Sequence, residues 1–204
     1  MVFDNSVKDF GKVMQGEMLE HVFDFSNQGS DTLEILGVEA ACGCQTTTLS
    51  DKRILPGQSS RVEINVDTAL LMGAIEETAR ITTNDPRRRT VFFSIKADVQ
   101  PEISLSSPSI YFGDVPEGEQ VAREVILTVM AEKTIEILSA ESSEKSVVVK
   151  LEPLPGSGGK KVKLTATHKG DGKIGYRSGS ITVKTTSTIT PELLIYLFIR
   201  NLNR

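Results

Sequence analysis

The chain of 204 residues has no tryptophan, only 5% aromatic residues, two cysteines and two histidines. Since His21 and His168 are the only histidines, general acid–base chemistry has few candidates. The net charge of −4 provides no basic surface of the kind that binds nucleic acid. No apolar run reaches the roughly 18 residues needed to cross a bilayer, so we expect no membrane span. Because 39% of the residues are still hydrophobic, we expect a folded protein rather than a disordered one.

Motifs of the common enzyme classes are missing as well. There is no nucleophile elbow, no phosphate-cradling glycine loop and no histidine pair at metal-ligand spacing. We therefore predict a protein that is not an enzyme and that needs no cofactor, with copper as the one exception that a cysteine pair leaves open. No export signal is visible after Met1.

What the sequence does contain is one pattern written twice, at an offset of 102 residues. Phe10-Gly11-Lys12-Val13 recurs as Phe112-Gly113-Asp114-Val115. The same offset relates Gly16 to Gly118, Leu33-Glu34-Ile35 to Ile135-Glu136-Ile137, Gly73 to Gly175, and Val91-Phe92-Phe93 to Leu193-Leu194-Ile195. A repeat of about a hundred residues predicts two copies of one domain, residues 1–100 and 101–204, with the boundary near Gln100-Pro101.

Within each copy, apolar residues alternate with polar ones. In the first copy Leu19, His21, Phe23 and Phe25 fall on one face of a run with period two. Turn formers such as Leu55-Pro56-Gly57-Gln58 separate these runs. We find no convincing long amphipathic helix; residues 69–79 have some helical character, but Gly73 interrupts them. Short alternating strands with a turn about every ten residues predict an all-β fold, an antiparallel sandwich in each copy.

The order of motifs in the first copy resembles a known family. These motifs are Phe10-Gly11, Gly16-Glu17, residues 21–29, Leu33-Glu34-Ile35, Cys42-Gly43-Cys44, Pro56-Gly57 and residues 82–86 (Thr-Thr-Asn-Asp-Pro). Over residues 8–99 the chain resembles the bacterial family called domain of unknown function 1573, which is similar to the domains of major sperm protein, PapD-type pilus chaperones and Hydin-type proteins. The resemblance implies an immunoglobulin-like sandwich, outside the cytoplasm, and it implies no established activity. The internal repeat extends this expectation to the second copy, so we predict two tandem immunoglobulin-like sandwiches.

Cys42 and Cys44 are present in the first copy alone, so the fold does not require them. Gly43 permits a tight turn that brings both sulfurs to one side. Several interpretations remain open: a soft-metal site, with Cu(I) favoured over Zn(II); a reversible disulfide across one residue; a half-bridge to a partner; or two buried small side chains at the end of a strand. A zinc site with four ligands that includes both histidines is not expected, because His21 and His168 belong to different copies.

The last long strand is apolar on both of its faces. Residues 193–199 read Leu-Leu-Ile-Tyr-Leu-Phe-Ile, whereas the corresponding residues 91–97 of the first copy carry polar side chains on one face. Since one face of such a strand already packs on the core, Leu194, Tyr196 and Phe198 require another cover. The cover is the first domain, loops of the same domain, a second subunit, or a partner protein.

Together these observations predict a non-enzymatic tandem module for protein binding or scaffolding. Its partner is another protein or a second copy of the chain, met through Leu194, Tyr196 and Phe198. The alternative is a redox-active or copper-handling protein that uses Cys42 and Cys44. An extracytoplasmic location, periplasmic or extracellular, follows from the resemblance and from the expectation that a Cys-x-Cys pair is oxidised there.

Overall fold

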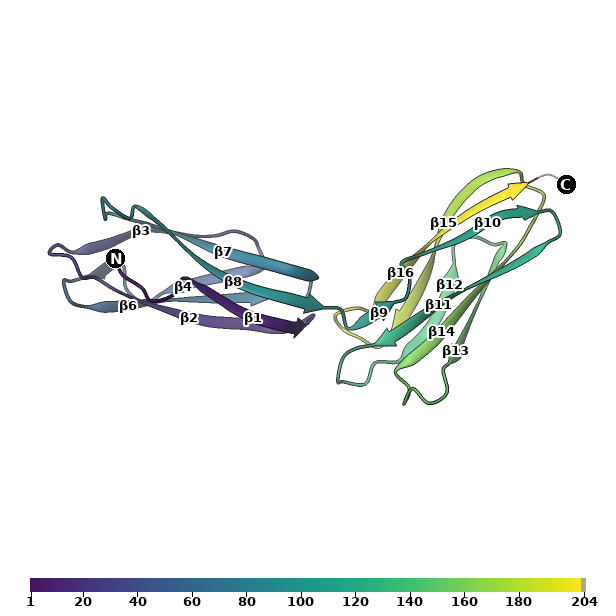
Figure 1. The fold of residues 1–204 in the computed structure, drawn as a ribbon, viewed down its shortest axis with the longest axis horizontal. Helices are drawn as coiled ribbons and strands as arrows, with labels where there is room; N and C mark the ends of the chain where they lie inside the picture. Colours follow the sequence, from purple (N-terminus) through teal and green to yellow (C-terminus); the bar gives the residue numbers. More distant parts are fainter. Residues whose placement is uncertain (203–204) are drawn as a thin grey trace. The chain divides into compact units, whose positions relative to one another are not determined.

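The computed structural model describes residues 1–202, and within them every regular element is a β-strand. The chain divides into two compact units, Met1–Gln100 and Pro101–Arg204. None of the described residues belongs to a helix that is long and apolar enough to cross a membrane. Figure 1 labels the strands of both units.

The first unit is a sandwich of two sheets. Its strands are β1 (Val7–Met14), β2 (Met18–Ser26), β3 (Leu33–Ala40), β4 (Gln45–Leu49), β5 (Arg53–Ile54), β6 (Ser59–Asp67), β7 (Gly73–Thr83) and β8 (Thr90–Gln100). One sheet has the order β1-β8-β7-β3-β5 and the other β2-β6-β4. β1 pairs with β8 in parallel, while the neighbouring pairs are antiparallel. Residues 69–79, which have some helical character in the sequence, include the start of β7, so this local signal is overridden by sheet pairing.

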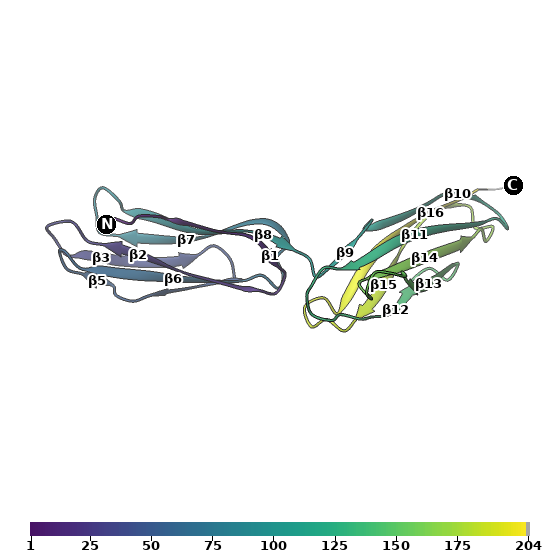
Figure 2. The same cartoon turned by 60° about the horizontal axis from the view of Figure 1, so that its bottom comes forward.

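The second unit repeats this plan. Its strands are β9 (Ile103–Leu105), β10 (Ser109–Pro116), β11 (Gln120–Val129), β12 (Ile137–Ser142), β13 (Val147–Pro153), β14 (Lys161–Lys169), β15 (Gly175–Thr185) and β16 (Glu192–Leu202). The sheets have the orders β10-β16-β15-β12 and β13-β14-β11-β9, and β10 pairs with β16 in parallel (Figure 2). Two facing sheets with this strand order define an immunoglobulin-like sandwich, so the fold class expected from the sequence is confirmed.

The Phe-Gly motif that marks the repeat forms a β-bulge in both units. The pairing register of β1 shifts between Asp9 and Lys12, and that of β10 shifts between Tyr111 and Asp114. Gly11 and Gly113 lie at these bulges with φ of 66° and 77°, a region that residues with a Cβ rarely adopt. The bulge lets each strand keep its parallel partner over its whole length, which explains why glycine recurs there.

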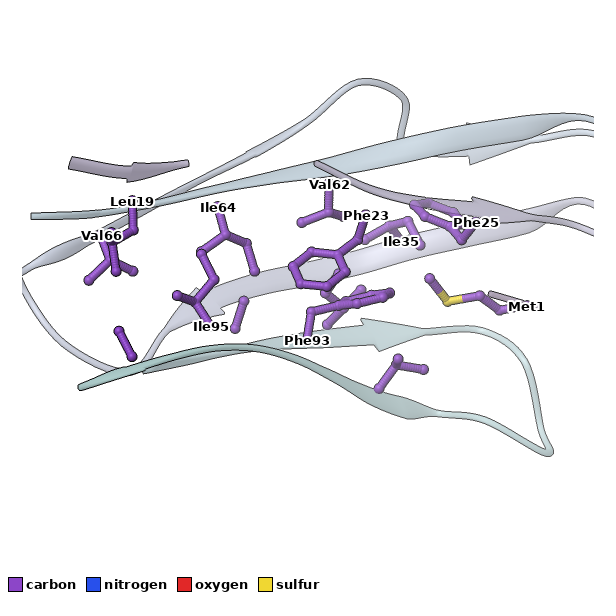
Figure 3. Packing of buried hydrophobic residues seen from close by; sticks show 14 of the residues in the cluster. Met1, Leu19, Phe23, Phe25, Ile35, Val62, Ile64, Val66, Phe93 and Ile95 are labelled. Carbon is purple, nitrogen blue, oxygen red and sulfur yellow. The ribbon is translucent and has the colours of Figure 1, made fainter. Parts of the chain in front are cut away.

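The core of the first unit lies between its two sheets. Phe23 of β2 and Phe93 of β8 meet across the sandwich with ring centroids 4.9 Å apart. Ile64 and Ile95 are fully buried beside them (Figure 3). Fully burying each such side chain stabilises the fold by about 1.5–3 kcal/mol. The apolar residues of the alternating runs therefore face the core, as the sequence predicts.

Candidate functional site

The cysteine pair lies where the chain crosses from one sheet of the first unit to the other. Cys42-Gly43-Cys44 connects β3 to β4, and Cys42 and Cys44 form a disulfide with a Cα–Cα distance of 5.3 Å. The carbonyl of Cys44 accepts a hydrogen bond from the amide of Asp67, at 2.9 Å. Both cysteines are half-buried. Among the interpretations that the sequence left open, the structure contains the disulfide between two cysteines that are separated by one residue.

Glu77 lies beside the disulfide, a position that no pattern in the sequence indicated. Both Sγ atoms and a carboxylate oxygen of Glu77 lie within 4.8 Å of one another. Glu77 is half-buried on the side of β7 that also carries the buried Ala79 and Ile81. Among the hydrogen bonds and ion pairs between described residues, none involves the Glu77 side chain. The period of two in β7 could have predicted that Glu77 faces inward, but only the packing of the β3–β4 loop brings it to the sulfurs.

The disulfide contributes little to the stability of the fold. Closing a loop of three residues lowers the entropy of the unfolded chain by an amount equivalent to about 1.5 kcal/mol, half of what a loop of 15 residues gives. The second unit folds without it: Glu144 and Ser146 stand where the cysteines would be at the 102-residue offset. There, Arg177 pairs with Glu144 at 3.3 Å and joins the loop to the sheet.

The second candidate is the outer face of the sheet β10-β16-β15-β12 in the second unit. Leu194, Tyr196 and Phe198 project from β16 and are 49%, 53% and 40% exposed. About half of the surface of each side chain is thus covered within its own unit, and the rest is exposed. Tyr111 of β10 stacks on Phe198 with ring centroids 4.7 Å apart and an interplanar angle of 12°. Tyr111 was not singled out in the sequence, although it alternates with the buried Ile110 and Phe112.

A charged residue bounds this aromatic row at each end of β16. At one end, Arg200 pairs with Asp114 and lies over the ring of Tyr176, 5.6 Å from its centroid. Hydrogen bonds to the Tyr176 hydroxyl and to Asp114 raise the pKa of Arg200 above its usual value. Its guanidinium is charged at any physiological pH, as in every arginine. At the other end of the strand stands the exposed Glu192. We call Leu194, Tyr196, Phe198 and Tyr111 the aromatic face.

The corresponding face of the first unit is built from ion pairs. Lys96 stands where Phe198 stands in the second unit, and it pairs with Glu76 at 3.2 Å. Arg80 pairs with Glu39 across β7 and β3 at 2.5 Å. Phe92 is the exposed aromatic residue here, at 53%. Since one sandwich folds with a charged face, the aromatic face of the other is not a requirement of folding.

The turn formers Lys169-Gly170-Asp171-Gly172 follow His168 and predict that it is exposed, but this prediction is wrong. It is fully buried at the end of β14, and Nε2 lies 2.8 Å from Oδ1 of Asn201, whereas Nδ1 lies 3.2 Å from the carbonyl of Ser146. His21 is half-buried, with its ring edge-on to Phe23 at 4.6 Å. Burial, and then the charge of Lys8, lower the pKa of His21. Each histidine thus has a partner within its own unit.

Comparison with known families identifies the first unit. Residues 1–99 match the family described as "Protein of unknown function (DUF1573)". The first unit belongs to this family, which confirms the resemblance carried by the motifs between Phe10 and Pro86. No curated protein matches the chain.

Solved structures that are similar to the chain share little sequence identity with it. A protein of unknown function from Porphyromonas gingivalis W83 is 12% identical, each chain is covered to 98%, and the TM-score is 0.41. The secreted serine protease VesC from Vibrio cholerae is 11% identical with a TM-score of 0.39; 96% of this chain matches 50% of that one. The titin tandem A164-A165 is 12% identical with a TM-score of 0.35, over 100% of this chain and 97% of that one.

Proposed function

We propose that the protein is a non-enzymatic binding module that associates through the aromatic face of its second unit. The observation that carries this proposal is the contrast between two copies of one fold. Two ion pairs lie on the sheet face of the first unit, whereas a stacked pair of aromatic rings lies on that of the second. Aromatic residues on an exposed, well-ordered sheet are typical of the centre of a protein interface.

The partner that fits this face is a second copy of the chain. Along β16 the outward-facing residues read Glu192, Leu194, Tyr196, Phe198 and Arg200. A two-fold axis through Tyr196 would set Leu194 of one copy against Phe198 of the other, and would bring Glu192 to Arg200. The row is therefore complementary to itself in both apolar and charged positions, as an isologous dimer requires. Two such faces would stack at the roughly 10 Å spacing of packed sheets.

Replacing Phe198 by glutamate is expected to abolish this association. The substitution places two carboxylates in the apolar centre of the dimer, and we expect the dissociation constant to rise at least about a hundredfold. The measurement is gel filtration with light scattering over a range of protein concentrations. The matched control is Phe92→Glu, which makes the same change at an exposed position of the first unit, 53% exposed against 40% for Phe198. A wild-type protein that is monomeric throughout the range would contradict self-association.

We also propose that the module works in an oxidising compartment outside the cytoplasm. The Cys42–Cys44 disulfide supports this location, since disulfides persist mainly in secreted and periplasmic proteins. Alkylation of free thiols in intact cells is the test: we expect both cysteines to be protected until a reductant is added. Two freely alkylated cysteines would contradict the proposal.

A further inference from the structure

The cysteine loop has a feature that neither folding nor the aromatic face explains. Glu77 turns a carboxylate toward Cys42 and Cys44 from the inner side of β7, and no positively charged side chain or hydrogen-bond donor among the described residues pairs with it. The carboxylate is therefore free to act as a ligand beside the two sulfurs. None of the three residues is kept in the second unit, where Glu144, Ser146 and Gly179 stand at the 102-residue offset.

We propose that Cys42, Cys44 and Glu77 form a zinc site that becomes able to bind the metal when the disulfide is reduced. Two thiolates and one carboxylate are a donor set that Zn²⁺ accepts, with a fourth position left to water. Cu(I) is the weaker candidate, because it prefers soft sulfur ligands and gains nothing from a carboxylate oxygen. Glu77 thus reverses the order of metals that the two cysteines alone suggest.

The distances require only local movement. Zinc binds sulfur at about 2.3 Å and oxygen at about 2.0 Å, so the donor atoms of a tetrahedral site lie roughly 3.5–3.8 Å apart. The carboxylate oxygen and the sulfurs already lie within 4.8 Å of one another. After reduction the sulfurs must separate from bonding distance, and Gly43 between them has no atom within 4 Å of the position a Cβ would take. The loop therefore has room to adjust.

The redox step balances with a dithiol as the reductant. The Cys42–Cys44 bond breaks, and the two sulfurs take up two electrons and two protons from a dithiol donor, whose own sulfurs become a disulfide. Zn²⁺ then displaces the two thiol protons to water and binds the thiolates. The oxidised loop offers no thiolate, so reduction controls metal binding.

Titration of the full chain with Zn²⁺ tests this site. The protein is reduced with a phosphine, freed of reductant under anaerobic conditions, and titrated against a chromophoric chelator; Co²⁺ serves as a second probe, because thiolate ligands give it a charge-transfer absorption. We expect the reduced protein to bind one Zn²⁺ and the oxidised protein none. Glu77→Gln is expected to weaken binding at least about tenfold, because one of three protein ligands is lost.

The matched control is Glu76→Gln, one residue away on the outer face of β7, where the side chain pairs with Lys96. It is expected to bind Zn²⁺ as the wild type does, whereas Cys42→Ser/Cys44→Ser is expected to stay folded by circular dichroism and to bind none. Absence of binding by the reduced wild type would overturn the proposal. If Glu77→Gln binds Zn²⁺ with the affinity of the wild type, the site consists of two thiolates alone and the proposal is also overturned. Binding of Zn²⁺ by the oxidised protein would overturn it as well.

Discussion

Gly170→Ala is expected to lower the free energy of unfolding of the second unit by about 2–3 kcal/mol. A Cβ at this position would lie 2.1 Å from the carbonyl oxygen of Pro116 and 2.9 Å from its carbon. Two backbone hydrogen bonds hold these segments together: the amide of Gly170 donates to Glu119 at 2.9 Å, and that of Gly118 donates to Gly170 at 3.0 Å. The obstacle is backbone rather than a flexible side chain, so relief requires the two loops to separate.

Chemical denaturation of the full chain, fitted with one transition for each unit, measures the loss. The control is Gly37→Ala in the first unit, where a Cβ meets nothing within 4 Å, and we expect a change within about 1 kcal/mol. The first unit has Thr68 at the position equivalent to Gly170, and its hydroxyl donates to the carbonyl of Glu17 at 2.7 Å. If Gly170→Ala unfolds at the wild-type denaturant concentration, the loops do not approach as described.

Asn201→Val is expected to destabilise the second unit by about 2–4 kcal/mol. Asn201 joins the two sheets: its Oδ1 faces Nε2 of the buried His168 at 2.8 Å, and its Nδ2 donates to Asp171 at 2.7 Å. Asp171 in turn pairs with Arg177 at 3.1 Å. Valine leaves the imidazole nitrogen buried without a partner, and the cost of that desolvation is not recovered.

The double variant His168→Val/Asn201→Val is expected to recover most of this loss. It recreates the first unit, where Val66 and Val99 occupy the equivalent positions and are fully buried. Replacing both members of a buried polar pair by apolar residues is often nearly neutral, whereas removing one is costly. Thermal unfolding of the wild type, both single variants and the double variant gives the coupling energy. Additive losses would show that the two side chains do not depend on each other.

The fold follows closely from patterns in the sequence, because they are local. The alternation of polar and apolar residues determines which side chains face the core. The two β-bulges are 102 residues apart because each requires a glycine with positive φ at the same place in the repeat. The prediction that His168 is exposed was wrong because it relied on the Lys-Gly-Asp-Gly turn that follows. Two other patterns in the sequence, the alternation along the strand and the 102-residue offset, indicate a buried position. Leu164, Ala166 and His168 share one face of β14, and the offset places His168 on Val66 of the first unit.

Only some residues of the two candidate sites could be predicted from the sequence. Leu194, Tyr196 and Phe198 stood out because a strand with two apolar faces breaks the alternation rule. Tyr111 and Glu77 did not, since Tyr111 reaches its site through the pairing of β10 with β16 and Glu77 through the pairing of β7 with β3, in each case strands far apart in the sequence. A cross-strand neighbour depends on register, and a single sequence without a known register does not supply it.

Sedimentation velocity on Tyr196→Ser/Phe198→Lys tests the aromatic face most directly. These are the residues that the first unit carries at the equivalent positions, Ser94 and Lys96, so the sandwich is known to tolerate them. We predict that the wild type shifts from monomer to dimer as its concentration rises, while the variant stays monomeric and melts at a similar temperature. A variant that dimerises as strongly as the wild type, or a wild type that never dimerises, would contradict the account.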